Sequence, residues 1–124
     1  MTNALFVCSR NRLRSPTAEQ LFAAWPGLRT ASAGTSADAD EPVTPELLAW
    51  ADLVFVMEPV HRRRLASRFA PALRGKRVVC LDIPDEFDFM APSLVALLRQ
   101  RVPRHLAQAP GQPEASALQQ EASA

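Results

Sequence analysis

A short apolar run, Ala4–Val7, leads directly into the sequence CSRNRLRSP, in which five residues separate Cys8 from Arg14. An apolar run of this length that ends at polar residues predicts a buried strand. Ser15 followed by Pro16 is typical of a helix start, because serine is a good N-cap and proline in the first helical position needs no N–H partner. The chain therefore begins with a strand, a tight loop and a helix.

The loop between this strand and helix has the length needed to curl around one tetrahedral phosphate. In such a loop the Cys8 sulfur lies below the phosphorus, and the Arg14 guanidinium matches two phosphoryl oxygens from the side. Backbone N–H groups and the positive end of a helix favour both a bound anion and a nucleophilic thiolate. The alternative is a buried thiol at a strand end, since free cysteine is among the most buried residue types.

Apolar runs and helix starts alternate along the rest of the chain. Further strands are expected at Leu28–Ala33, Leu53–Met57 and Arg77–Ile83. Helices are expected at residues 15–25, 44–51, 59–69 and 92–102, the last continuing past Pro103 in one interpretation, and Thr44 before Pro45 repeats the cap-then-proline start. This alternation predicts an α/β fold, a three-layer structure with a four-stranded parallel sheet and helices on both faces. Ligands bind such sheets at the carboxyl ends of the strands, and Cys8 lies at one of these ends.

The 124 residues are enough for one domain, which we expect to span residues 1–107. Residues 108–124 are rich in Ala, Gln, Ser, Pro and Glu and are expected to form a disordered tail. A net charge of +1 gives no reason to expect nucleic acid or a membrane surface as a partner.

No segment has the roughly 20 apolar residues of a membrane span, and the first apolar run is too short for a signal peptide. We therefore expect a cytoplasmic protein in which Cys8 and Cys80 are free thiols. The sequence also contains no cluster of metal ligands, so neither a metal nor another cofactor is expected.

A proton donor is expected from the loop PDEFDF, which follows the fourth predicted strand. Strand ends of a parallel sheet converge on one edge, which brings Asp85 toward Cys8. An aspartic acid there can protonate a leaving oxygen and then activate water against a phosphocysteine. Asp82 is the next candidate for this role, because spacing alone does not determine geometry.

The sequence VCSRNRLRSP resembles the phosphate-binding loop of low-molecular-weight protein tyrosine phosphatases, and a compact subset described as predicted phosphatases has a similar loop. Further matches are Ser32–Thr35, Leu53–Met57 and Pro84–Phe87. The resemblance covers about residues 4–105 and implies the strand order 2-1-3-4. It also implies hydrolysis of a phosphotyrosine protein or a small phosphomonoester through a phosphocysteine intermediate.

The resemblance assigns a role to each residue that matches the family pattern. Cys8 would be the nucleophile, Arg14 the phosphate clamp and Asp85 the general acid. The phosphate-binding set would be Ser9, Arg10, Asn11, Arg12, Leu13, Arg14 and Ser15, with Asn11 and Ser15 supporting the loop.

The interior of the loop departs from the family pattern. Arg10 stands where the family usually has glycine, Arg12 where it has an apolar residue, and Leu13 where many members have a second cysteine. The extra arginines favour a more anionic ligand than a simple aryl phosphate. In the acid loop Glu86 replaces a proline after the aspartate, and Phe87 and Phe89 stand where the family's substrate-flanking aromatics would be.

Two other functions are compatible with the sequence. Arsenate reductase-like thiol chemistry uses a similar loop in one lineage but needs further cysteines. Only Cys80 is available, and it is expected in the fourth strand, so this chemistry would require relay through an external thiol. A non-catalytic phosphate- or phosphopeptide-binding domain would keep the loop without turnover.

Elsewhere, His61 and the arginines Arg62–Arg64 are expected on a solvated helix face. Trp25 and Trp50 are expected to pack at helix ends.

Overall fold

The computed structural model describes residues 1–106, so the predicted tail at residues 108–124 lies outside the described residues. Its four-stranded parallel sheet has the order β2-β1-β3-β4, which confirms the predicted architecture. The strands are β1 (Thr2–Cys8), β2 (Leu28–Gly34), β3 (Leu53–Val56) and β4 (Arg77–Cys80). The helices are α1 (Arg14–Phe22), α2 (Pro45–Trp50), α3 (Pro59–Leu73), α4 (Pro92–Arg101) and α5 (Pro103–Leu106).

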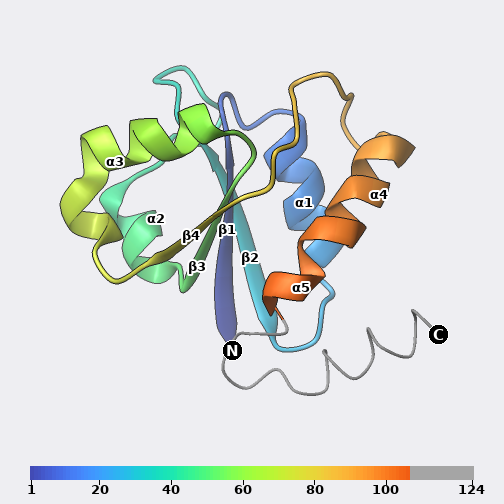
Figure 1. Cartoon of the computed structure of the whole chain (residues 1–124), viewed down its shortest axis with the longest axis horizontal. Helices are drawn as coiled ribbons and strands as arrows, with labels where there is room; N and C mark the ends of the chain where they lie inside the picture. The colour runs from blue at the N-terminus through green and yellow to red at the C-terminus, as the bar shows by residue number, and fades with distance from the viewer. Residues whose placement is uncertain (107–124) are drawn as a thin grey trace.

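Helices cover both faces of the sheet (Figure 1), and an apolar side-chain layer lies on each face. One face packs against α1, α4 and α5, where the Phe6 ring stacks against Phe22 and Phe55 with centroids 5.9 and 5.2 Å away. The other face packs Leu5 and Val7 against α2 and α3. Because the central strand β1 is covered on both faces, its sequence reads as a continuous apolar run rather than an alternating one.

The start of α1 differs from the prediction. The helix begins at Arg14, with Leu13 in the N-cap position, so Ser15 is not the cap. The Ser15 hydroxyl contacts the Cys8 sulfur instead, at 2.9 Å. Pro16 remains compatible with the helix because the N–H groups of a first turn have no partner inside the helix. At α2 the prediction is confirmed, since the Thr44 hydroxyl accepts a hydrogen bond from the Leu47 N–H at 3.1 Å.

The fourth strand is shorter than predicted and ends at Cys80, because Asp82 adopts a left-handed backbone (φ 55°). The N–H groups of Leu81 and Ile83 nevertheless donate to carbonyls at the end of β3 and just beyond it. Helix α3 is longer than predicted, because it continues past Phe69 to Leu73 with a non-helical backbone at Phe69. The chain after β4 is therefore held close to the end of the sheet, where Cys8 lies.

Gly34, at the end of β2, lets this strand approach the Cys8–Arg14 loop. A Cβ atom at Gly34 would lie 2.5 Å from the Ser9 carbonyl oxygen and 2.6 Å from the Ala39 Cβ. The next two N–H groups, of Thr35 and Ser36, donate to the carbonyls of Cys8 and Ser9 at 2.9 Å. The backbone of the loop is therefore fixed from one side by a segment that requires glycine.

We expect Gly34→Ala to lower the free energy of unfolding by about 2 kcal/mol, because the added methyl group overlaps backbone that cannot move freely. The loop should shift as well, and phosphate affinity should fall. Urea denaturation and phosphate titration measure the two effects. Gly75→Ala is the control: nothing lies within 4 Å of its Cβ position, so only the strain of its φ of 73° remains, about 1 kcal/mol. Equal phosphate affinity in the two variants would contradict this account.

Candidate active site

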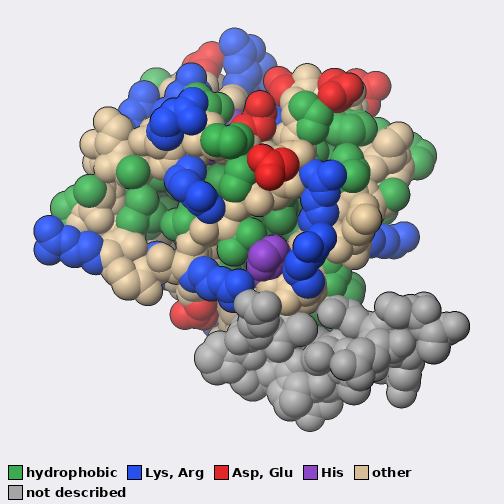
Figure 2. Space-filling view, viewed as in Figure 1, with side chains coloured by type: hydrophobic (Ala, Val, Ile, Leu, Met, Phe, Trp, Pro, Cys, Tyr) green, Lys and Arg blue, Asp and Glu red, His purple; other side chains and the backbone are tan. Residues whose placement is uncertain are grey.

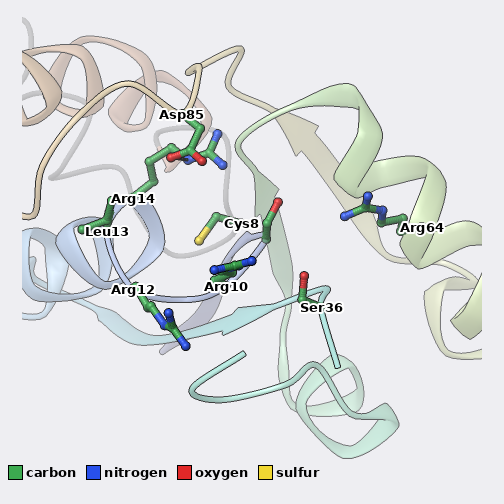
Figure 3. Close-up of a pocket in the computed structure, with 9 residues that line it drawn as sticks. Cys8, Arg10, Arg12, Leu13, Arg14, Ser36, Arg64 and Asp85 are labelled. Atoms are coloured by element: carbon green, nitrogen blue, oxygen red, sulfur yellow. Dashed lines mark ion pairs between the residues drawn. The ribbon is translucent and has the colours of Figure 1, made fainter. Parts of the chain in front are cut away.

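A cavity of about 590 Å³ opens at the carboxyl ends of the strands (Figure 3). The Cys8 sulfur points into it from the end of β1, with Arg14 and Asp85 on one side of the sulfur and Arg64 on the other. The sequence predicted most of its lining but not Ser36 or Arg64. The lining residues are Cys8, Ser9, Arg10, Arg12, Leu13, Arg14, Ser36, Arg64 and Asp85.

Behind the cavity, Asn11, Ser15 and Cys8 form a buried hydrogen-bonded chain. The Asn11 side-chain amide donates to the Ser15 hydroxyl at 3.0 Å, and that hydroxyl lies 2.9 Å from the Cys8 sulfur. Asn11 has a φ of 59°, a left-handed backbone that asparagine tolerates better than most residues. The Ser15 hydroxyl proton has two acceptors within reach, the Ala33 carbonyl at 3.4 Å and the nearer Cys8 sulfur, to which it can donate when Cys8 is a thiolate.

The backbone of the Cys8–Arg14 loop has its carbonyls and its N–H groups in different environments. The carbonyls of Cys8, Ser9 and Arg10 accept hydrogen bonds from the segment that follows β2. By contrast, the N–H groups of residues 9–13 donate to no acceptor among residues 1–106. A series of unpaired N–H groups next to a helix N-terminus is a binding site for an anion.

Arg14 is buried and is held by groups from two other strand ends. Its Nη1 atom donates to the Glu58 carboxylate at 2.6 Å and to the Ile83 carbonyl at 2.8 Å. Its Nε atom lies 3.8 Å from a carboxylate oxygen of Asp85. Only 2% of Arg14 is exposed, so these partners offset the cost of burying its charge and fix the plane of the guanidinium.

The structure distinguishes the two candidate acids by position. Asp85 lines the cavity that contains Cys8, and 65% of its side chain is exposed. Asp82 lines a separate cavity of about 250 Å³ beside Cys80 and Arg101. The expectation that strand ends converge is therefore confirmed for Asp85, while Asp82 does not reach the Cys8 cavity.

His61 does not lie on a solvated helix face, so the prediction for this residue is wrong. Its side chain is fully buried, whereas the following arginines, Arg62–Arg64, are exposed. Nδ1 of His61 accepts a hydrogen bond from the Glu58 N–H at 3.0 Å, so the proton of the neutral ring is on Nε2 and is donated to the Ser9 hydroxyl at 2.9 Å. Burial, together with the nearby Arg14 charge, lowers the pKa of His61 to about 4. In the sequence, the signal for this capping contact was the three-residue spacing between Glu58 and His61 at a helix start.

The remaining residues of the predicted phosphate-binding set divide into two groups. Ser9, Arg10, Arg12 and Leu13 line the cavity, whereas Asn11 and Ser15 lie behind it. Arg12 forms an ion pair with Asp40 at 3.3 Å. Neither phenylalanine of the acid loop lines the cavity, since Phe87 packs against the core and Phe89 is exposed.

Cys8 and Cys80 are both free, as predicted. Cys80 is partly buried in β4, and β3 lies between it and the strand that ends at Cys8. Burial raises the pKa of the Cys80 thiol. Across residues 1–106 no three His, Cys, Asp or Glu side chains are grouped to hold a metal ion, and none of the described helices is long and apolar enough to span a membrane.

Solved structures with a similar fold include several phosphatases. The tyrosine phosphatase Wzb from Escherichia coli K30, in complex with phosphate, is 27% identical with a TM-score of 0.67, covering 83% of this chain and 94% of its own. A serine mutant of the YwlE arginine phosphatase with a phosphorylated active-site serine is 26% identical with a TM-score of 0.66, covering 88% and 98%.

A low-molecular-weight protein tyrosine phosphatase from T. tengcongensis shares the fold at 23% identity, with a TM-score of 0.64 and coverage of 81% and 92%. No protein-family model and no curated protein sequence matches the chain. The resemblance noted from the sequence is therefore confirmed at the level of three-dimensional structure, and the chain has the fold of low-molecular-weight protein tyrosine phosphatases.

The buried His61 predicts a specific acid sensitivity. Its pKa is about 4 in the folded protein against an ordinary value of 6.5, so the unfolded chain binds the proton first in this window. Stability from this group is present above pH 6.5 and is lost as the pH falls toward 4, by roughly 3 kcal/mol in total. We expect His61→Gln to be less stable at pH 7 but to have a flatter stability profile. Urea denaturation at pH 7 and 4.5 checks this.

The control is His105→Gln, which removes the other histidine, a partly exposed one, and should keep most of the slope. An unchanged slope in His61→Gln would show that the ring does not contribute in this way.

Proposed function

We propose that this chain is a phosphatase that hydrolyses phosphomonoesters through a phosphocysteine intermediate. One observation carries the proposal: the Cys8 sulfur points into a cavity at a loop whose backbone N–H groups are unpaired, with Arg14 and Asp85 beside it. Thiol, anion site and carboxyl group are the three components that phosphoryl transfer to cysteine requires.

In the first step the Cys8 thiolate attacks phosphorus while the bond from phosphorus to the leaving oxygen breaks. The loop N–H groups and Arg14 bind the other phosphoryl oxygens and stabilise the charge of the transition state. The carboxylic acid form of Asp85 gives its proton to the leaving oxygen, which departs as an alcohol or phenol. The products of this step are phosphocysteine, the free alcohol and the Asp85 carboxylate.

In the second step water attacks the phosphorus of the phosphocysteine. The Asp85 carboxylate takes a proton from this water, and the phosphorus–sulfur bond breaks to release phosphate and the Cys8 thiolate. The Ser15 hydroxyl, 2.9 Å from the sulfur, donates a hydrogen bond to the leaving thiolate. Asp85 is then protonated again, and no metal or redox partner is consumed.

The comparisons support the reaction class more strongly than the substrate. The similar structures include tyrosine phosphatases and an arginine phosphatase, one of them a mutant with a phosphorylated active-site serine. We therefore propose a phosphotyrosine protein or a small phosphomonoester as the substrate.

Arsenate reduction is less well supported. A thiol must resolve the cysteine–arsenic adduct, and Cys80 is two strand spacings from Cys8, about 10 Å within the sheet. Cys80 also lines the separate cavity beside Asp82. A phosphate-binding domain without turnover is the other alternative, and the two assays below distinguish it from an enzyme.

We expect Cys8→Ser to lower the hydrolysis of p-nitrophenyl phosphate at least about a thousandfold, because serine is a much weaker nucleophile at neutral pH. Phosphate binding should persist, since the loop N–H groups and Arg14 remain. Cys80→Ser is the matched control and should keep wild-type turnover. Phosphate binding without hydrolysis in the wild-type protein would instead identify a binding domain.

We expect Asp85→Asn to lower kcat about a hundredfold for alkyl phosphates and less for p-nitrophenyl phosphate, whose leaving group needs little protonation. Asp82→Asn is the control, because asparagine tolerates the left-handed backbone at this position and Asp82 does not line the cavity. A larger loss in Asp82→Asn than in Asp85→Asn would assign the proton donor to the other acid.

A further inference from the structure

The cavity extends well beyond the reacting phosphoryl group. Its volume of about 590 Å³ lies in the range of pockets that enclose a whole small ligand. Asp85 and Arg14 occupy one side of the Cys8 sulfur, and Arg10, Ser36 and Arg64 lie on the other (Figure 3). No aromatic side chain is among the lining residues. The second side is therefore built for a polar group rather than for stacking an aryl ring.

The arginines of the cavity differ in whether an acid compensates them. Arg12 pairs with Asp40 at 3.3 Å, and Arg14 pairs with Glu58 at 2.6 Å. Neither Arg10 nor Arg64 has a carboxylate within ion-pair distance anywhere in residues 1–106. The free positive charge of the cavity is therefore concentrated on the side away from Asp85.

Arg64 is also held in place by an uncharged group. Its Nη1 atom donates to the Thr35 hydroxyl at 3.3 Å, and Arg68 donates to the Thr35 carbonyl at 2.7 Å. These contacts direct the Arg64 guanidinium without neutralising it. Figure 2 shows the end of the molecule where the strands end at the cavity. There, basic side chains lie mainly on the α3 side and acidic side chains mainly over the segment between β4 and α4.

We infer that Arg10, Ser36 and Arg64 form a second anion subsite, which binds a phosphate or carboxylate on the leaving-group part of the substrate. Guanidinium groups match both anions with paired N–H donors, and the Ser36 hydroxyl adds a further donor. The inference rests on the proposed function, because the reacting phosphoryl group is placed over Cys8. The preferred substrate carries two anionic groups, the reacting phosphate and one more.

Matched substrates with and without the second anion test the subsite. One arm compares a phosphotyrosine peptide flanked by Glu with the same peptide flanked by Gln, and the other compares glucose 1,6-bisphosphate with glucose 6-phosphate. In the wild-type protein we expect kcat/KM to be roughly three- to tenfold higher for the doubly anionic member of at least one pair. The arm with the larger ratio identifies a peptide or a small molecule as the source of the anion.

Arg64→Gln should reduce that ratio to near one, whereas Arg63→Gln should leave it unchanged, since Arg63 is exposed on the same helix and does not line the cavity. Equal kcat/KM within both pairs in an active wild-type protein would overturn the subsite while leaving the proposed function intact. If no substrate is hydrolysed, the proposed function fails, and titration of Cys8→Ser with both members of each pair tests the subsite by itself. Equal affinities in that titration would overturn it.

Discussion

The buried guanidinium of Arg14 is the contact on which the rest of the site depends. It joins the loop after β1 to Glu58 after β3 and to Ile83 after β4, so three strand ends meet at one charge. A buried arginine is stable only with partners of this kind. The same contacts place Asp85 beside the cavity and fix the side of the loop opposite the β2 segment. The parallel sheet brings these segments to one edge, and the Arg14 contacts hold them together.

Contacts on the sides away from the cavity hold the Cys8–Arg14 loop in place. The loop is open only toward the cavity. Asn11 and Ser15 hold the Cys8 sulfur, and neutral His61 holds Ser9. Close approach at Gly34 lets the β2 segment pair with the loop carbonyls. The loop N–H groups are left for a ligand. In the proposed reaction an anion site preorganised in this way does not need to reorganise, and this would be the physical basis of its catalytic value.

Local patterns were sufficient to predict the strands, the Thr44 cap and the position of Cys8 and Arg14, because apolar runs and caps are encoded within a few residues. Predictions were wrong where a tertiary contact outweighed a local preference. Ser15 is a good N-cap, yet its hydroxyl is used by Cys8. His61 adjoins three exposed arginines but is buried beneath the loop. Arg12 is compensated by its ion pair with Asp40, so Arg64 rather than Arg12 carries free charge in the cavity. The spacing of residues in the sequence does not reveal this ion pair.

The central claim is that Cys8 becomes phosphorylated during turnover. Rapid acid quenching of the Asp85→Asn protein with substrate, followed by mass spectrometry of its peptides, tests this claim most directly, because the variant should slow hydrolysis of the intermediate. The account predicts one added phosphoryl group on the peptide that contains Cys8, absent from Cys8→Ala treated in the same way, because alanine has no atom that can accept the group. Turnover with no phosphoryl adduct on that peptide, or with the adduct on another residue, would contradict it.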